Sequence, residues 1–204
     1  MSVCRIVGAG ECRKIDFEKK SDELIIAADG GCAYLDKAGI VPDVIIGDFD
    51  SLGYVPKGNE VIILNPVKDI TDMDAAVKEG IKRGFTEFHL YGACGGRIDH
   101  TLANILVASL SARNIRAFIH DESIITAVTN GKIKFDAEYK GYISVFSHSD
   151  KSEGLTIEGL KYTLENAAFS NNFPLGVSNE FIGKESSISV ENGTLIIIYS
   201  EKKD

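Results

Sequence analysis

Basic residues are scarce in this chain of 204 residues: 22 Lys and Arg stand against 30 Asp and Glu, giving a formal net charge of −8. Wide contact with nucleic acid needs a basic face, so we expect no nucleic-acid partner. No apolar run approaches the ~20 residues of a membrane span, so we expect no membrane partner either. The composition, 44% hydrophobic and 25% charged, is ordinary for a globular protein and argues against disorder.

Paired cysteine motifs are also missing. Cys4, Cys12, Cys32 and Cys94 show neither Cys-x-x-Cys pairing nor zinc-type spacing. Residues 1–8 lack the charged region and long apolar core of a secretory signal, and they are typical of a first strand instead. We therefore expect free thiols and a cytoplasmic protein.

Strand-like and helix-like segments alternate over the first ~120 residues. The strand-like segments are short, β-branched and apolar, as in strands buried on both faces of a parallel sheet. They lie at Val3–Val7, Leu24–Ala28, Val44–Gly47, Val61–Leu64, Phe88–Tyr91 and Ala117–Ile119. The helix candidates are Gly31–Ala38, Thr71–Arg83 and Asp99–Arg113. This alternation predicts an α/β domain with a doubly wound, mostly parallel sheet over residues 1–122.

The pattern changes after about residue 121 to short alternating segments, with turn pairs such as Asn130-Gly131 and Asn192-Gly193 between them. Strands are expected at Ile124–Thr129, Lys132–Phe135, Tyr142–Ser147, Gly154–Glu158, Ser186–Val190 and Leu195–Tyr199. Because no helical pattern remains, residues 123–204 are predicted to form a C-terminal antiparallel β-sandwich domain.

Four aspartates, Asp29, Asp48, Asp50 and Asp72, stand where apolar runs change to Gly, Ser or Thr. In an open α/β sheet the carboxyl ends of the strands are where ligands bind. Carboxylates gathered there without a cation would repel one another and raise their pKa values. Mg²⁺ relieves that conflict, and proteins usually bind it through one or two carboxylates plus substrate phosphates. The four aspartates therefore predict metal-assisted phosphate chemistry.

Each aspartate also has a simpler explanation. If the chain stays extended, Asp48 and Asp50 project to one face with Cα atoms roughly 7 Å apart, but a polar strand end before a turn fits as well. The run at residues 29–31 suits an anion at a helix start, and a plain strand-to-helix turn suits it equally. Helix capping explains one or two of the acids around Asp72, but it does not explain why they occur together with Asp48 and Asp50.

A glycine-rich loop gives the second strong signal. Gly95 and Gly96 lie between a predicted strand and a helix, where their amides can form an anion nest. Arg97 offers a bidentate fork for phosphate oxygens. Asp99 either orients Arg97 or caps the helix, and we favour such a supporting role over direct chemistry. His100 suits a substrate contact or a hydrogen bond at the helix start.

Two common nucleotide signatures are incomplete here. The loop lacks the Gly-x-x-x-x-Gly-Lys-Ser/Thr pattern of a Walker A motif. Gly8-Ala9-Gly10 is half of a dinucleotide fingerprint, with Arg13 in place of its third glycine. This departure argues against an NAD-dependent oxidoreductase.

These motifs together resemble the thiamine pyrophosphokinase family, whose members move a diphosphate from ATP to thiamine and release AMP. The matching segments follow the family's order over nearly the whole chain: Asp29–Gly31, Pro42–Ser51, Asp69–Asp72, Gly95–His100, Gly159–Leu164 and Gly176–Glu180. The resemblance implies that residues 1–122 are the catalytic ATP and Mg²⁺ domain and that residues 123–204 help to bind thiamine. It also implies a homodimer with active sites at the subunit interface.

The resemblance assigns a role to each matching residue. Asp48, Asp50 and Asp72 are implied to hold Mg²⁺ and to serve catalysis. The implied ATP and phosphate site comprises Asp29, Gly30, Gly95, Gly96, Arg97 and Asp99. Ser178 and Asn179 match the segment that meets the pyrimidine ring of thiamine, in a pocket completed by the partner subunit. Tyr162 stands where some relatives carry Trp; stacking on a flat or cationic ring and a place in the core both suit it.

The expected reaction is in-line attack of thiamine's primary hydroxyl on the β-phosphorus of ATP, with either Asp72 or Asp50 as general base. Arg97, the loop amides and Mg²⁺ are expected to hold the phosphates and neutralise their charge. A diphosphokinase acting on a hydroxymethyl pterin is the nearest enzymatic alternative, but it would not need the Ser178–Asn179 segment. A thiamine- or nucleotide-binding protein without catalysis is the alternative from another class.

Overall fold

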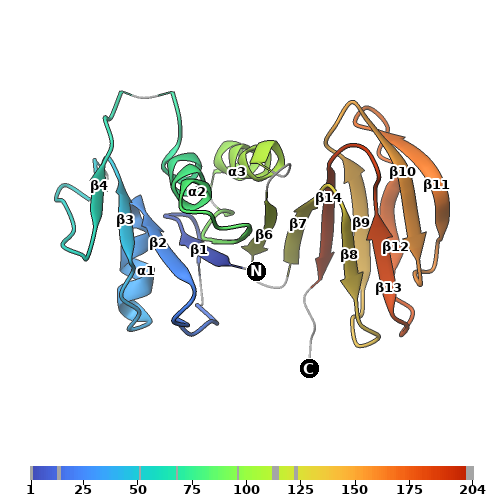
Figure 1. Cartoon of the computed structure of the whole chain (residues 1–204), viewed down its shortest axis with the longest axis horizontal. Helices are drawn as coiled ribbons and strands as arrows, with labels where there is room; N and C mark the ends of the chain where they lie inside the picture. Colours follow the sequence, from blue (N-terminus) through green and yellow to red (C-terminus); the bar gives the residue numbers. More distant parts are fainter. Residues whose placement is uncertain are drawn as a thin grey trace. The chain divides into compact units, whose positions relative to one another are not determined.

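The computed structural model describes residues 2–12, 15–50, 52–67, 69–95, 97–111, 115–121 and 124–200. The chain divides into two compact units, which are described separately below (Figure 1). The first comprises Met1–Ala108 with Ile119–Glu122, and the second comprises Ser109–Phe118 with Ser123–Asp204. The predicted domain boundary between residues 122 and 123 lies outside the described residues.

The first unit is built on a sheet whose strands lie in the order β6-β5-β1-β2-β3-β4. Its strands are β1 (Val3–Val7), β2 (Leu24–Ala28), β3 (Val44–Gly47), β4 (Val61–Ile63), β5 (Glu87–Tyr91) and β6 (Arg116–Asp121). The pairings from β5 through β1, β2 and β3 to β4 are parallel. The helices are α1 (Cys32–Lys37), α2 (Asp72–Lys82) and α3 (Ile98–Ser111), and a short 3-10 turn spans Asp29–Gly31.

Burial explains why the sequence forms this sheet. Strands β2 and β3 are buried along their whole length, as central strands covered on both faces must be. Helix α2 packs against β1, β2 and β3, and its Met73, Ala76 and Val77 are buried. Gly31 lets the chain pass close to the sheet, because a Cβ atom there would lie 1.8 Å from the backbone oxygen of Val7. The predicted α/β fold is confirmed.

The second unit contains two four-strand sets, ordered β12-β9-β14-β7 and β11-β10-β13-β8. Their pairings are antiparallel. The strands are β7 (Ile124–Thr129), β8 (Lys132–Phe135), β9 (Tyr142–Ser147), β10 (Lys151–Glu158), β11 (Leu164–Ser170), β12 (Gly176–Glu180), β13 (Ser186–Ser189) and β14 (Leu195–Ser200). The predicted β-rich C-terminal half is confirmed. Strands β11 and β12 were not expected from the sequence, because they are rich in Glu, Asn, Gly and Ser and show no simple alternation.

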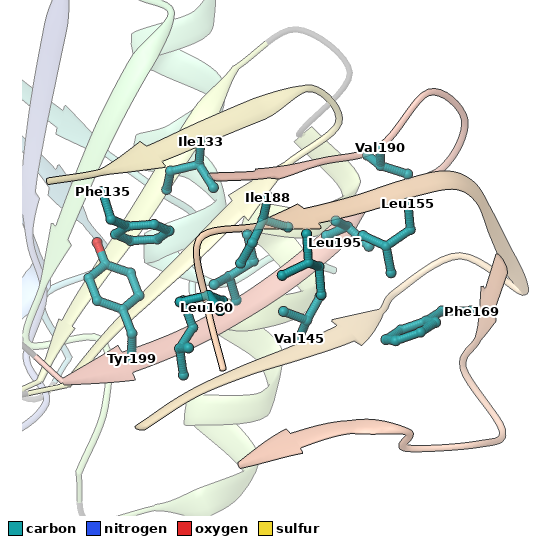
Figure 2. Packing of buried hydrophobic residues seen from close by; sticks show 13 residues of the cluster. Ile133, Phe135, Val145, Leu155, Leu160, Phe169, Ile188, Val190, Leu195 and Tyr199 are labelled. Carbon is teal, nitrogen blue, oxygen red and sulfur yellow. The ribbon is translucent and has the colours of Figure 1, made fainter. Parts of the chain in front are cut away.

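A hydrophobic cluster lies at the core of this second unit. Side chains from the β8, β10 and β13 set point toward those of β9 and β14 (Figure 2). Ile143, Leu155, Ile188, Leu195 and Ile197 are fully buried. Burying one such side chain stabilises a fold by about 1.5–3 kcal/mol, so this cluster accounts for the sandwich without any disulfide.

Candidate active site

A cavity of about 590 Å³ opens at the carboxyl ends of β1 and β5. The strand order reverses between these two strands, because β2, β3 and β4 follow on one side of β1 while β5 and β6 lie on the other. Ligands of open α/β sheets bind at such a reversal. Much of the lining comes from residues 8–11 after β1, residues 92–95 after β5 and residues 70–73 at the start of α2.

Three of the four aspartates share this cavity. Asp29, Asp48 and Asp72 all line it, although they come from the ends of β2 and β3 and from the first turn of α2. One carboxylate oxygen of Asp29 and one of Asp72 are buried. Asp50 is exposed and is not among the described lining residues. The structure thus brings three of the predicted carboxylates together and leaves the fourth at the surface.

The chain at Asp48 and Asp50 is not extended, so the premise that both project from one face of a strand is wrong. Strand β3 ends at Gly47, and Phe49 has a φ of 59°. The Phe49 ring is only 3% exposed and belongs to the core cluster beside β2 and β3. Its burial turns the chain, and the backbone N–H of Asp50 then donates to Asp48 Oδ1 at 3.3 Å.

Within the described part of the chain, no three Asp, Glu, His or Cys side chains lie close enough together to hold a metal ion. The aspartates therefore line one cavity without forming a closed cage. Mg²⁺ does not require such a cage, because it usually takes one or two carboxylates, substrate phosphates and water. Asp48 and Asp72 provide oxygen donors of that kind.

Helix α2 presents Asp72 through a defined N-cap. Thr71 has extended backbone angles, and its Oγ1 accepts a hydrogen bond from the backbone N–H of Asp74 at 3.1 Å. Thr71 is therefore a side-chain N-cap of the helix. The Asp74 carboxylate pairs with Lys78 Nζ at 2.9 Å. Asp72, the first helical residue, is thereby fixed beside the cavity.

The glycine-rich loop after β5 packs its backbone against the backbone of the segment that follows β1. The N–H of Gly10 donates to the carbonyl of Gly92 at 2.9 Å, and the N–H of Glu11 donates to that of Cys94 at 3.0 Å. Gly92 has a φ of +57°, and a Cβ atom there would lie 2.5 Å from the Gly8 oxygen, so only glycine fits. Gly95 lines the cavity, while Gly96 lies outside the described residues.

Asn104 on α3 is a cavity residue that the sequence analysis missed. Its side chain is buried and lines the cavity, and its Nδ2 donates to the carbonyl of Ala93 at 2.6 Å. The bond ties the helix to the loop that follows β5. The only available signal was an amide within the otherwise apolar stretch Leu102–Ala108.

Arg97 and Asp99 form a bidentate ion pair at the rim of the cavity. Arg97 Nε donates to Asp99 Oδ1 at 3.1 Å, and Nη2 donates to Oδ2 at 2.5 Å. Hydrogen bonds from the guanidinium lower the pKa of Asp99 to about 2. Arg97 and His100 line the cavity and are exposed. Of the two supporting roles left open for Asp99, this geometry matches the one in which it orients Arg97.

The predicted thiamine-binding residues lie in the second unit, in and beside β12. Ser178 is exposed, has a φ of 60°, and donates its N–H to Ser144 Oγ at 3.1 Å. Asn179 is 6% exposed, and its amide faces the backbone of Tyr162. Tyr162 is 60% exposed, which excludes the core position that the sequence left open.

Two family models match the chain. The model described as "Thiamin pyrophosphokinase, catalytic domain" covers residues 17–119, and the model described as "Thiamin pyrophosphokinase, vitamin B1 binding domain" covers residues 130–195. The chain belongs to the thiamine pyrophosphokinase family. The predicted family is confirmed, and so is the prediction of an enzyme that transfers pyrophosphate to thiamine.

Relatives of the thiamine pyrophosphokinase family match over nearly the full length. Thiamine pyrophosphokinase of Bacillus subtilis is 32% identical over 212 residues, which cover 98% of this chain and 99% of the relative. A crystal structure of the enzyme from that organism superposes with a TM-score of 0.86 at 28% identity, over 98% of this chain and 100% of that one. Thiamin pyrophosphokinase from Geobacillus thermodenitrificans gives a TM-score of 0.83 at 28% identity, over 99% of each chain.

The two thiamin pyrophosphokinase models divide the candidate residues. The cavity aspartates and Arg97 fall within the catalytic-domain match, while Tyr162, Ser178 and Asn179 fall within the vitamin B1 binding match. Among the helices described, none is both long and apolar enough to cross a membrane.

Proposed function

We propose that this chain transfers the diphosphate group of ATP to the primary hydroxyl of thiamine, giving thiamine diphosphate and AMP. Membership of the family supports thiamine diphosphate formation by pyrophosphate transfer. One observation carries the ATP part of the proposal: Asp48, Asp72 and Arg97 line the same cavity at the strand reversal. Carboxylates and a guanidinium facing one space suit a ligand that combines phosphates with a divalent cation.

Arg97 and the glycine loop are the phosphate-binding part of this site. Arg97 uses two of its five N–H groups on Asp99, which leaves the rest of the fork for phosphate oxygens. Gly95 contributes its amide at the same rim, and the family resemblance assigns the same role to Gly96. Phosphoryl-transfer enzymes act mainly through positioning and electrostatics, so this fixed geometry is the chain's main contribution to rate.

Asp48 and Asp72 would hold Mg²⁺ together with the phosphates, and Asp50, which the sequence assigns to the same set, would join them from the neighbouring turn. When bound, the ion supplies positive charge at the phosphate oxygens. Asp72 is the better candidate for the general base, because it lines the cavity and is fixed at the helix start. Its carboxylate would accept the proton of the attacking hydroxyl.

We extend the proposal to a homodimer with active sites at the subunit interface. The second unit carries apolar side chains that are 44% to 63% exposed, and exposed apolar patches commonly mark interaction sites. They are Tyr142, Tyr162, Phe173, Leu175, Val177 and Ile182. Light scattering during gel filtration should give a mass twice the 22.1 kDa of one chain; a mass of one chain contradicts the dimer.

Release of AMP from ATP in the presence of thiamine and Mg²⁺ tests the reaction. We expect Asp48→Asn and Asp72→Asn to fold normally and to lose activity by about 100-fold or more, since each removes a charge at the phosphates. Asp50→Asn measures the contribution of the exposed aspartate. Asp36→Asn, an exposed position on α1 outside the cavity lining, is the matched control.

Full AMP release by both Asp48→Asn and Asp72→Asn, at saturating ATP and Mg²⁺, would contradict the assignment of the site. Substituting a hydroxymethyl pterin for thiamine separates the nearest enzymatic alternative, since a pterin enzyme would release AMP only with that alcohol. A wild-type protein that binds thiamine or ATP and releases no AMP would be a binding protein instead.

A further inference from the structure

We infer that Asn179 serves thiamine binding as a positioning residue that fixes Tyr162, and that its side chain is not itself the main ligand to the substrate. The inference rests on the proposed function for the identity of the ligand. Its structural basis lies entirely within the second unit, at the end of β12 and the turn between β10 and β11.

The Asn179 amide is committed to backbone groups. Its Oδ1 accepts from the N–H of Tyr162 at 2.9 Å and from the N–H of Glu180 at 2.9 Å. Its Nδ2 donates to the carbonyl of Tyr162 at 2.7 Å. An asparagine has two acceptor sites and two N–H donors, so only one N–H remains. The backbone N–H groups of Tyr162 and Glu180 also fix the orientation of the Asn179 amide. If the amide were turned the other way, its NH₂ group would face these two donors.

A bulge in β12 explains why the adjacent residues Ser178 and Asn179 have different roles. The pairing with β9 runs from Gly176 opposite Val145 to Asn179 opposite Ile143, so β12 contains one extra residue. Ser178 lies within this bulge in the left-handed region, at a φ of 60°. Bulges re-aim side chains and are frequent beside active sites. Here the bulge turns Asn179 inward and leaves Ser178 exposed at the surface.

The hydrogen bonds between the Asn179 amide and the Tyr162 backbone form a clamp. This Asn179 clamp positions the Tyr162 ring, which packing alone does not hold. Tyr162 is 60% exposed, so its position depends on its backbone. The N–H of Lys161 donates to the carbonyl of Glu180 at 3.0 Å, and Lys161 Nζ pairs with the Glu180 carboxylate at 2.8 Å. The same ammonium lies 5.5 Å from the centre of the Tyr162 ring. A ring that already faces one cation is suited to a flat cationic ring such as a thiazolium.

Hydrogen exchange at the Tyr162 amide tests the clamp without any substrate. We expect Asn179→Ala to speed this exchange by about tenfold, because the amide loses its acceptor. Asn171→Ala, which removes an exposed asparagine of the same unit, should leave the rate unchanged. Unchanged exchange in Asn179→Ala would overturn the inference. If that variant does not fold, Asn179→Leu, which nearly preserves the side-chain volume and also lacks the acceptor, should show the same faster exchange, and an unchanged rate would overturn the inference.

A double-mutant cycle with Tyr162→Ala separates positioning from direct contact. We expect Asn179→Ala to raise the KM for thiamine by about tenfold, with kcat and the KM for ATP nearly unchanged. In the Tyr162→Ala background the same substitution should change the thiamine KM by less than about twofold. An equal effect in both backgrounds would show direct contact by Asn179 and overturn the inference.

Failure of the proposed function would look different from failure of this inference. A wild-type protein without thiamine-dependent AMP release refutes the proposed function. The exchange rate at Tyr162 still decides, in that case, whether Asn179 fixes the ring.

Discussion

Arg97 and Asp99 face each other as two parallel forks, with N–O distances of 3.1 Å and 2.5 Å. Their side chains are 72% and 60% exposed. Ion pairs this exposed contribute little to stability, because water and salt screen them. The value of the pair therefore lies in orientation: Asp99 selects one conformation of a long, flexible side chain at the rim of the cavity.

Asp99→Asn is predicted to impair ATP binding more than stability. The amide removes the charge that holds the guanidinium, so we expect the KM for ATP to rise by about three- to tenfold. The thermal midpoint should stay nearly unchanged, because water and salt screen an ion pair this exposed. Steady-state kinetics and thermal unfolding measure the two effects. Arg97→Ala, which removes the fork itself, should be more severe; an unchanged KM for ATP in both variants contradicts this role.

Thr71→Ala is predicted to destabilise helix α2 and so to disturb Asp72. Losing a side-chain N-cap costs about 1 kcal/mol, which corresponds to a fall of about 2–4 °C in the thermal midpoint of a chain of this size. Thr71→Ser keeps the hydroxyl that accepts from the Asp74 N–H and should retain the midpoint. Circular dichroism at 222 nm makes the comparison. Equal midpoints for the Ala and Ser variants would show that the cap is not a source of stability.

Local sequence was sufficient where burial and turn chemistry agree. The expected strands at Val3–Val7, Leu24–Ala28 and Val44–Gly47 coincide with β1, β2 and β3, because each is a largely apolar run that ends at or just before a polar or glycine residue. The Asn130-Gly131 pair likewise marks the end of β7 before β8. The convergence of Asp29 and Asp72 on one cavity followed from the parallel strand order alone.

Long-range packing set the features that the sequence did not reveal. The turn at Phe49 depends on burial of its ring among residues distant in the sequence, so the separation of Asp48 from Asp50 had no local signal. The inward turn of Asn179 depends on a bulge against β9, in a strand whose residues have weak strand propensity. At the Asp48–Asp50 turn and at Asn179, the sequence pattern indicated which segment belongs to the candidate site. Tertiary contacts determined the direction in which each side chain points.

A partly buried polar network on β1, β5 and β6 gives the fold a dependence on pH. His89 Nδ1 lies 2.8 Å from His120 Nε2, and His89 Nε2 lies 3.2 Å from Glu87 Oε1. The His120 ring stacks on Tyr91 at 4.5 Å between centroids, and Arg5 donates to the Tyr91 hydroxyl at 3.2 Å. Glu23 pairs with Arg5 at 2.8 Å from the other side.

Burial, together with the smaller effects of the nearby His89 and Arg5, lowers the pKa of His120 to about 3. The unfolded chain protonates this histidine near pH 6.5, whereas the folded chain does not until about pH 3. The unfolded state therefore binds more protons as pH falls between these values, and stability is lost over that window.

His120→Gln is predicted to weaken this pH dependence while keeping a polar side chain beside His89. Between pH 7.5 and pH 5.0, the wild-type free energy of unfolding should fall by about 2 kcal/mol more than that of the variant, since one fewer group takes up a proton on unfolding. Urea denaturation at the two pH values gives both differences. His148→Gln, in the second unit and outside this network, shows whether removing any histidine has the same effect. Parallel pH dependence of wild type and His120→Gln would mean that His120 takes up its proton equally in the folded and unfolded states.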